Sequence, residues 1–531
     1  MPGTYTYPGI YIEEVPSGVH PIVGATTAET AFVDFFARGP VDRAQRVTSF
    51  GDFTRIFGGL DSRSEASYAV QQYYLNGGQV AWVVRIGVGA PPTASHHLTG
   101  GSPPQDTIVV SAVNAGAWGN HVQVAAVTSP VAGRFDLFVR EVTTEGGRTQ
   151  VVAAEEYRNL TMALGDRRYA VDVVNAASSL VTLEDAGLGA PPVTVAPTPS
   201  GGAPETAFAA LDGGTDGTAF SADGSIADPA AFAAALVGDG TAKTGMRALD
   251  RIEPFTFNIL CLPATAALDA GNATTVLSAA TTYCEAHRAF LIVDIPPDVA
   301  SLDDMIQWTA DNATLRHQNA AVYFPRVLVP DPLNEGRPRD TGPSGTMAGV
   351  YARTDAARGV WKAPAGTEAT LRGTTLAVVL NDLENGALNP LGVNVLRNLP
   401  IFGNVCWGGR TLVGADQQAS EWKYIPVRRT AMFIEESLRQ GLSWVVFEPN
   451  DEPLWSQIRL NLGAFMQGLF RQGAFQGQTP REAYLVKCDK ETTTQADVDR
   501  GVVNILVGFA PLKPAEFVVI RIQQLAGQQQ A

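Results

Sequence analysis

The spacing of apolar residues along the chain predicts several kinds of segment. Near-continuous apolar runs predict strands at Thr26–Phe36 and in QVAWVVRIG. Between them, SFGDFTRIFGG predicts a short capped helix, and Ser64–Leu75 predicts a second helix that closes at Gly77 and Gly78. Alternating helices and buried strands of this kind are typical of an α/β layer.

The same alternation returns from about Ala230. FTFNILCLP, AFLIVDIPP and AAVYFPRVLVPD predict buried strands, AAFAAAL and Asn272–His287 predict helices, and Ser301 suits the cap of another helix. Residues 21–87 contain too few strands for a stable sheet of their own. We therefore expect them to join residues 216–345 in one discontinuous α/β domain.

Residues 88–215 have a different pattern and predict an inserted domain. VGAPPTASHHLTGGSPPQD predicts a loop, and short alternating runs such as TIVVSAV, VQVAAVT, RFDLFVREV and YAVDVV predict strands separated by Gly, Pro and Asn. The segment ends in the Pro/Gly/Ser/Thr-rich linker GLGAPPVTVAPTPSGGAPET. These features predict a β-rich domain that interrupts the α/β domain.

Residues 346–510 predict a C-terminal α+β domain. Its start overlaps a Gly-, Ala- and Thr-rich stretch, Gly342–Gly373, that has little periodicity. Helix-like LAVVLNDLENG and the turn NPLGVN come next and lead to the closing part of the chain. SWVVFE, AYLVKC and VVNILVGF predict strands, and Asp451 with Pro453 suits the start of a helix. Two helical stripes are formed by Val427, Ala431, Ile434 and Leu438 and by Ile458, Leu462, Phe465 and Leu469.

Each end of the chain carries a strand candidate beside residues that can act as a hinge. Residues 1–20 and 511–531 predict extended arms, with hinge candidates Pro16, Gly18, Pro511 and Pro514. The hinge segments are expected to run from Pro16 to Gly24 and from Ala510 to Pro514. The strand in each arm either pairs at the edge of its own domain's sheet or adds to a sheet of a neighbouring subunit. The strand residues are Gly9, Ile10, Tyr11, Ile12, Glu13, Glu14, Val15, Phe517, Val518, Val519, Ile520, Arg521, Ile522 and Gln523.

The predicted fold class is therefore multidomain α/β and α+β. An α/β core layer carries an inserted all-β domain, and a C-terminal α+β domain and extended N- and C-terminal strand arms complete the chain.

Two sets of segments resemble the contractile tail sheath proteins of phage tails and extracellular contractile injection systems. YPGIYIEEVPSG, VTSFGDFTRIFGG and YAVQQYYLNGGQVAWVVRI resemble the opening of these proteins. RNLPIFGNVCWGGRTL, WKYIPVRRTAMFIEESLRQGLSWVVFEPND and FAPLKPAEFVVIRIQQ are similar to their closing domain. The segments occur in the family's order and cover roughly half the chain, whereas residues 90–215 show no such resemblance.

The resemblance implies a structural subunit that polymerises around an inner tube and contracts from a metastable extended state. It implies the inner tube, the baseplate and a tail terminator or cap as partners, besides further copies of the chain. Assembly is expected in the bacterial cytoplasm, followed by a place in a phage tail or released particle. The C-terminal domain would lie near the tube, with Arg428, Arg429 and Arg439 as tube-facing charges unless they pair with Glu435 and Glu436 or face water.

Charge and composition exclude some classes of binding partner. The net charge is −15 and no run of Lys and Arg exceeds two residues, so binding to nucleic acid or to an anionic membrane is not expected. No stretch reaches the roughly 20 apolar residues that span a bilayer, so we expect no membrane insertion. The four scattered cysteines suit a reducing compartment.

Possible catalytic groups do not combine into a known motif. Cys284 and His287 lack a second pair of metal ligands, and His96 and His97 fall in the predicted loop. GDGTAKTG lacks the glycine directly before the lysine of a phosphate loop. We expect no catalytic, cofactor or metal site. The alternatives to a sheath are a non-contractile shell or fibre protein and an α/β hydrolase-like enzyme with an accessory β domain.

Overall fold

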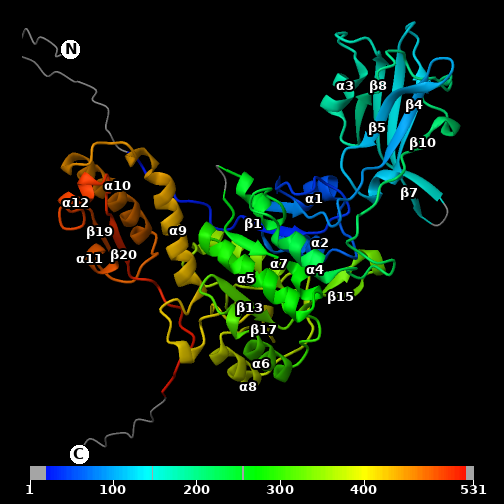
Figure 1. The fold of residues 1–531 in the computed structure, drawn as a ribbon. Coiled ribbons are helices and arrows are strands. Elements are labelled where there is room, and N and C mark those ends of the chain that lie inside the picture. The colour runs from blue at the N-terminus through cyan, green and yellow to red at the C-terminus, as the bar shows by residue number, and fades with distance from the viewer. Residues whose placement is uncertain (1–19, 146–147, 254–255, 522–531) are drawn as a thin grey trace, which may run out of the picture. The chain divides into compact units, whose positions relative to one another are not determined.

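The computed structural model describes residues 20–145, 148–253 and 256–521 (Figure 1). The chain forms two compact units. The large unit comprises Thr26–Arg358 and Ala363–Arg428, and the described part of the C-terminal unit comprises residues 20–25, 359–362 and 429–521. Among the described residues, no helix has both the length and the apolar character needed to cross a membrane.

The centre of the large unit is an eight-stranded sheet with the order β18-β17-β13-β12-β11-β1-β3-β2. The six inner strands are parallel, and β2 and β18 are antiparallel edges. Parallel strands covered on both faces read as continuous apolar runs, which is the pattern seen in the sequence. The strands are β1 (Thr30–Asp34), β2 (Gln45–Val47), β3 (Ala81–Arg85), β11 (Ile259–Cys261), β12 (Phe290–Val293), β13 (Ala320–Phe324), β17 (Asn394–Leu399) and β18 (Gly403–Cys406).

This sheet joins the two segments that flank the predicted insertion. Thr30 of β1 is aligned with Ala81 of β3 on one side and with Ile259 of β11 on the other. The sheet also continues past residue 345, where the sequence placed the start of the C-terminal domain. Because β17 and β18 complete the sheet, the boundary between the two units lies near Arg428 instead.

Seven helices accompany the sheet in the described part of the large unit outside the insertion. Helix α7 lies in the stretch where the sequence showed little periodicity. Its first nine residues, 344–352, are all buried, so no polar face marks it as a helix. The helices are α1 (Phe50–Phe57), α2 (Glu65–Asn76), α4 (Pro229–Val237), α5 (Ala270–His287), α6 (Leu302–Asp311), α7 (Ser344–Arg358) and α8 (Asp382–Leu388).

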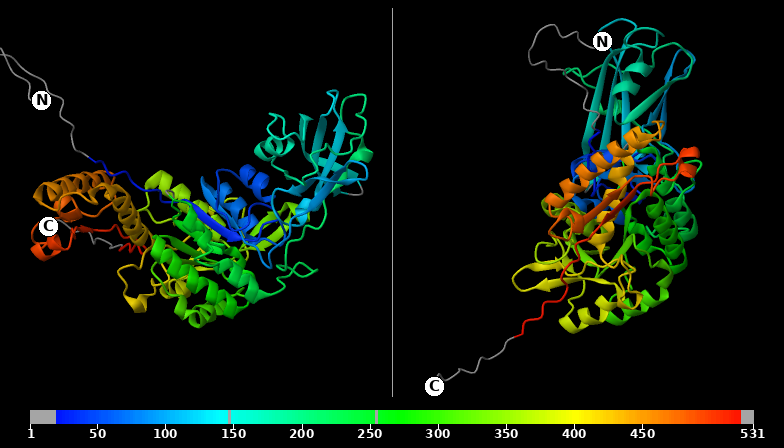
Figure 2. Two further views of the ribbon diagram at one scale, coloured as in Figure 1. Left: turned by 45° about the horizontal axis from the view of Figure 1, so that its top comes forward. Right: turned by 90° about the vertical axis from the view of Figure 1, so that its left-hand side faces the viewer.

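The inserted segment contains two antiparallel sheets, β10-β6-β7-β8 and β4-β5-β9, around one apolar core (Figure 2). Two expectations for it are wrong. YAVDVV forms helix α3 (Ala170–Ala177), since Ala170 and Val174 are buried one turn apart. The predicted loop contains β4 (Ser95–Gly100), which carries His96 and His97 and pairs with β5. The other strands are β5 (Gln105–Ala112), β6 (Val122–Thr128), β7 (Phe135–Glu145), β8 (Arg148–Leu160), β9 (Val181–Asp185) and β10 (Ala209–Ala210).

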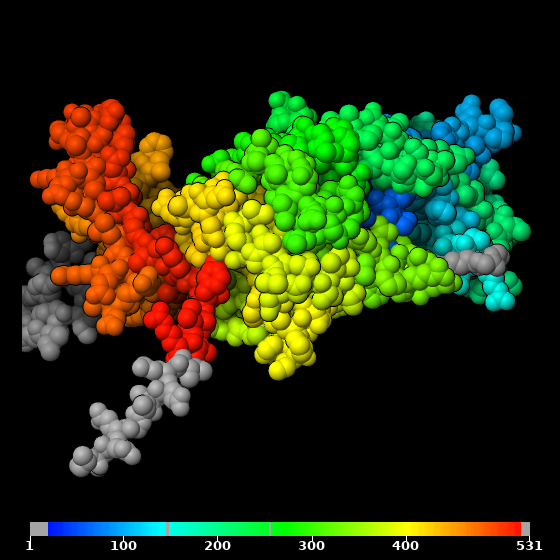
Figure 3. All heavy atoms as spheres, turned by 90° about the horizontal axis from the view of Figure 1, so that it is seen from below, coloured from blue at the N-terminus to red at the C-terminus, as the bar shows by residue number. Residues whose placement is uncertain are grey.

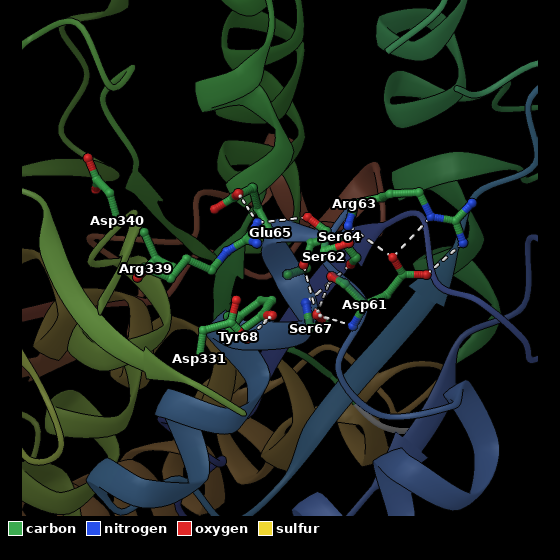
Figure 4. Close-up of polar contacts among 12 residues, drawn as sticks. Asp61, Ser62, Arg63, Ser64, Glu65, Ser67, Tyr68, Asp331, Arg339 and Asp340 are labelled. Carbon is green, nitrogen blue, oxygen red and sulfur yellow. Dashed lines mark hydrogen bonds and ion pairs between the residues drawn. The ribbon is translucent and has the colours of Figure 1, made fainter. Parts of the chain in front are cut away.

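A small three-stranded sheet, β15-β14-β16, lies beside the N-terminus of α2 in the large unit. Its strands are β14 (Val327–Asp331), β15 (Arg337–Thr341) and β16 (Thr375–Leu376). Figure 4 shows the polar contacts that hold it there. Arg339 of β15 donates to Glu65 of α2 at 2.7 Å, and the Tyr68 hydroxyl donates to Asp331 of β14 at 2.7 Å.

The C-terminal unit packs helices on a two-stranded antiparallel sheet, β19-β20. Both long helices lie where their apolar stripes predicted them, and Asp451 caps α10. SWVVFE is not a strand, because Ser443–Val445 forms a 3-10 turn and the chain then runs exposed to α10. The elements are α9 (Ile425–Gly441, in this unit from residue 429), α10 (Glu452–Arg471), α11 (Pro480–Ala483), β19 (Tyr484–Lys487), α12 (Gln495–Asp499) and β20 (Leu506–Phe509).

Candidate assembly interface

The β19-β20 sheet has one buried face and one exposed face. Val486 and Val507 are aligned partners whose side chains join the apolar core formed with α9 and α10. The alternate residues point the other way, and Leu485 and Leu506 are each 51% exposed. A leucine on each strand therefore lies on the outer face of the sheet.

Both long edges of this sheet are open. Among the described residues, β19 and β20 each have one neighbouring strand, and that neighbour is the other strand. An open edge presents unpaired backbone N–H and C=O groups, which can form hydrogen bonds with an added strand. Beyond the end of β20, Gln476 N donates to Ala510 O at 2.9 Å, and Ala510 N donates to Ala483 O at 2.8 Å. These bonds fix the point at which the C-terminal arm leaves the sheet.

The C-terminal arm forms no strand over its described residues. Phe517, Val518, Val519 and Ile520 are 75%, 82%, 79% and 79% exposed. Side chains on both sides of the segment are thus uncovered, including the aromatic ring of Phe517. The space-filling view shows the red end of the chain lying at the surface before the grey trace begins (Figure 3). Ile522 and Gln523 lie outside the described residues.

The hinge candidates differ between the two ends. Pro511 forms a bridge with Phe475, and Pro514 lies in the irregular stretch that follows. At the N-terminus, the predicted strand Gly9–Val15 and the hinge residues Pro16 and Gly18 lie outside the described residues. The sequence extended this hinge to Gly24, and the structure corrects that part of the expectation.

Residues 20–25 form a strap on α9 rather than a hinge. The His20 ring stacks on Trp444 with centroids 4.3 Å apart, and Ala25 N donates to the Ser437 hydroxyl at 2.9 Å. Ile22 packs so closely on Gly441 that a Cβ there would lie 2.7 Å from it. These contacts hold residues 20–25 to the C-terminal unit, and Pro16 and Gly18 stay as the predicted hinge residues of this arm.

The three arginines proposed to face a tube have different surroundings. Arg428 is 7% exposed, donates to Asn319 at 2.6 Å and lies over the Trp422 ring. Arg429 is 4% exposed. Only Arg439 has a half-exposed side chain, and it forms an ion pair with Glu436 at 2.6 Å. The burial of the first two disfavours them as surface charges, and the Arg439–Glu436 pair is the alternative that the sequence left open.

Two buried carboxylates of the large unit bind the first backbone N–H groups of helices. Burial raises the pKa of Asp34 to about 7, and its carboxylate accepts from Ala66 N at the start of α2 at 2.8 Å. Burial also raises the pKa of Asp294 to about 6, and this carboxylate accepts from Ser344 N at the start of α7 at 2.9 Å. Because helix N-termini favour negative charge, both groups have a structural role there.

The residues weighed as metal or catalytic groups are engaged elsewhere. Cys284 is buried, and His287 pairs with Asp250 at 3.1 Å. His97 pairs with Asp106 across β4 and β5. An open pocket of about 400 Å³ near α5 and α6 is lined by five aspartates, but Asp269 is the N-cap of α5 and Asp304 accepts from Ser301 N in the capping box of α6. No three His, Cys, Asp or Glu side chains within the described ranges are arranged to hold a metal.

Comparisons with known proteins agree with one another. Residues 417–524 match the phage tail sheath C-terminal domain. The chain is 27% identical over 179 residues to a tail sheath protein of the Vibrio phage KVP40, a match that covers 33% of this chain and 25% of that protein. It is also 27% identical over 300 residues to a putative prophage major tail sheath protein of Pseudomonas aeruginosa, covering 55% of this chain and 72% of that protein.

Solved structures share the fold over nearly the whole chain. The PVC sheath of an extracellular contractile injection system in its contracted state gives a TM-score of 0.57 at 20% identity, covering 98% of both chains. The contracted helical sheath of the anti-feeding prophage gives 0.56 at 23% identity, covering 98% of this chain and 100% of that chain. A sheath tail protein of Listeria innocua gives 0.58 at 14% identity, covering 92% and 96%. The resemblance to contractile sheath proteins seen in the sequence is confirmed.

Proposed function

We propose that this chain is the subunit of a contractile tail sheath. Copies polymerise around an inner tube, are linked by terminal strands donated to neighbouring copies, and contract from a metastable extended state to drive the tube through a target envelope. The observation that carries the proposal is that one unit contains both an unpaired apolar segment and a sheet that can accept added strands. An apolar segment, Phe517–Ile520, is uncovered, and the β19-β20 sheet has two open edges.

Strand donation would supply both specificity and strength. A donated strand forms about four to six backbone hydrogen bonds, each worth about 0.5–1.5 kcal/mol net. It also covers apolar side chains such as Val518 and Ile520, which are otherwise about four-fifths exposed. Two strands received by each sheet, one on each edge, would give every subunit several kcal/mol of linkage without any catalytic chemistry.

Contraction then requires the folded units to change contacts while the strands stay paired. The chain can rotate in the irregular segment after Pro511 and in the residues before the strap at His20. The energy would be stored in the extended polymer during assembly, and a baseplate would hold and then release that state. The C-terminal unit would lie towards the tube and the insertion outwards, with Arg439 as the remaining arginine candidate for a tube contact.

The alternatives are less well supported. An enzyme would bring acids together in a cleft. Asp294 does line the open pocket near α5 and α6, but its carboxylate accepts from Ser344 N at a helix start, and that of Asp34 accepts from Ala66 N. A static shell or fibre would also use terminal strands, so it is distinguished by behaviour. A sheath gives helical polymers with two different pitches before and after release, and a static polymer keeps one pitch.

The experiment is a deletion of residues 517–531, followed by electron microscopy and sedimentation. We expect folded monomers that form no tubes, because the donor strand is absent while the two compact units remain. Val518→Lys and Ile520→Lys should also block assembly, and Gln528→Lys, beyond the predicted strand, should not. Normal tubes from the truncated chain would refute strand donation.

A further inference from the structure

The turn between α9 and α10 presents an aromatic ring to solvent. Phe447 is 103% exposed and Val446 is 64% exposed. Phe447 also has φ 72, in the left-handed region that residues with a Cβ rarely adopt. An exposed aromatic side chain on a strained backbone is unfavourable in an isolated subunit, and such features concentrate where a partner binds.

This turn lies where the N-terminal arm leaves the C-terminal unit. His20 stacks on Trp444, three residues before Phe447. Ile22 packs in the same apolar cluster as Leu442, Trp444 and Val445. The last anchored residue of the arm and the exposed ring therefore share one short segment of the unit.

If the strand donation proposed above holds, the short distance along the chain between the donor strand and His20 places a neighbouring subunit near this turn. Five residue steps separate Val15, the end of the predicted donor strand, from His20. Five extended residues span at most about 18 Å. The sheet that receives the strand must therefore lie within about that distance of His20 and of the adjoining turn. The partner that contacts the exposed ring is then a second copy of this chain.

The receiving sheet offers a matching surface. Leu485 and Leu506 are exposed on its outer face, and Gly508 is aligned with Leu485. A Cβ placed on Gly508 would meet only the Leu485 Cβ, at 3.8 Å. The outer face thus has an open place beside two leucines, and an aromatic ring can cover a glycine in a sheet.

We propose that Phe447 is a contact residue between copies. Its ring covers Gly508 in the copy that receives the N-terminal strand and lies beside Leu485 and Leu506 of that copy. This contact is made by side chains and adds to the backbone pairing of the arms. It also explains why an exposed phenylalanine occupies a turn in which asparagine or glycine would be less strained.

The test compares Phe447→Ser with Leu460→Ser. Leu460 is 62% exposed on α10 in the same unit and serves as the matched control. The Phe447→Ser monomer should keep the wild-type urea midpoint because this side chain is not buried, and Leu460→Ser should lower the midpoint only slightly, through the lower helix propensity of serine. We expect the concentration needed for tube formation to rise at least tenfold for Phe447→Ser and to stay unchanged for Leu460→Ser.

A double variant, Phe447→Cys with Gly508→Cys, tests the position directly. The four native cysteines are buried, so an oxidant reaches the two introduced thiols first. Oxidation of assembled tubes should give a ladder of covalent oligomers in denaturing gels, and neither single variant should. Oxidised tubes that give no ladder of covalent oligomers would overturn the proposed contact between Phe447 and Gly508. A Phe447→Ser chain that assembles like the wild type would overturn it as well.

Deletion of residues 2–15 separates this inference from the proposal on which it rests. If that chain still forms tubes, strand donation from the N-terminus is wrong. If the deletion blocks assembly while the Phe447 variants give no ladder and no change in assembly, strand donation stands and the contact alone is wrong.

Discussion

Replacing Gly345 by alanine should destabilise the large unit, although alanine favours helices. Gly345 lies near the start of α7, where this helix packs against α2. A Cβ at this position would lie 2.2 Å from the Ala69 carbonyl oxygen and 2.6 Å from the Ala69 carbonyl carbon. Both are backbone atoms of α2, so no side chain can rotate away to make room.

The magnitude follows from two opposing effects. Exchanging glycine for alanine inside a helix gains about 1 kcal/mol. Forcing apart two packed helices costs about 1–3 kcal/mol, and this contact is at the upper end because the clash is with backbone. We expect a net loss of about 2 kcal/mol. Gly349, one turn later, has the same close approach, with a Cβ only 2.5 Å from the Tyr73 carbonyl oxygen.

Gly386→Ala is the matched control. Gly386 lies inside α8 in the same unit, and a Cβ there would meet nothing within 4 Å. The substitution should raise stability by about 0.5–1 kcal/mol. Urea unfolding of both variants, followed by circular dichroism, should move the midpoint in opposite directions. A Gly345→Ala midpoint at or above that of the wild type would refute the packing described for α2 and α7.

Two further outcomes are expected. Burial raises the pKa of Asp34 from 3.8 to about 7, so between these values the folded chain holds a proton that the unfolded chain releases. The contribution of Asp34 to the free energy of unfolding should therefore be lost as the pH rises from about 4 to about 7, by up to about 4 kcal/mol. Urea midpoints should fall less steeply across this range for Asp34→Asn, and an unchanged slope would contradict the assignment. Replacing residues 90–212 by a short Gly/Ser linker should preserve tube formation. The two ends of the insertion are adjacent, since Thr218 N donates to Val88 O at 3.0 Å. Loss of folding, measured by circular dichroism, would contradict this domain boundary.

The elements predicted correctly are those whose ends carry a local signal. Ser49 caps α1, Ser64 caps α2 and Ser301 caps α6, each through a side-chain oxygen that accepts from the backbone. The buried strands β3, β12 and β13 are apolar at nearly every position, which only a sheet covered on both faces requires. Local chemistry was therefore sufficient for these elements.

The errors occur where packing overrides the local pattern. In α7, small residues allow an approach to α2 so close that the helix has no polar face, and no periodicity marks it. SWVVFE has the composition of a strand, but its apolar residues serve different purposes. Val445 packs in the core, whereas Phe447 faces solvent. Composition alone does not distinguish an apolar residue that packs in a core from one that is exposed at the surface.

The same limit applies to the interface. Alternation in EFVVIRIQQ predicts a strand but not the sheet that it joins, since an edge in the same subunit and an edge in a neighbour require the same side chains. The decisive observation is exposure on both sides of the segment: Phe517 and Val519 on one side and Val518 and Ile520 on the other are all at least 75% exposed. A strand at the edge of its own sheet would bury one of these two sets.

The strap adds a mechanical consequence to this arrangement. If the N-terminal arm were free from Pro16 to Gly24, a donated strand could follow its neighbour over a wide range of orientations. Anchoring by His20, Ile22 and Ala25 removes the last part of that segment from the predicted hinge and so shortens the tether between the donor strand and its own unit. A shorter tether raises the effective concentration of the donor strand near its acceptor and restricts the directions in which neighbouring units can turn. Strand linkage and a directed change of pitch are therefore compatible, because the strap limits the motion that the strands permit.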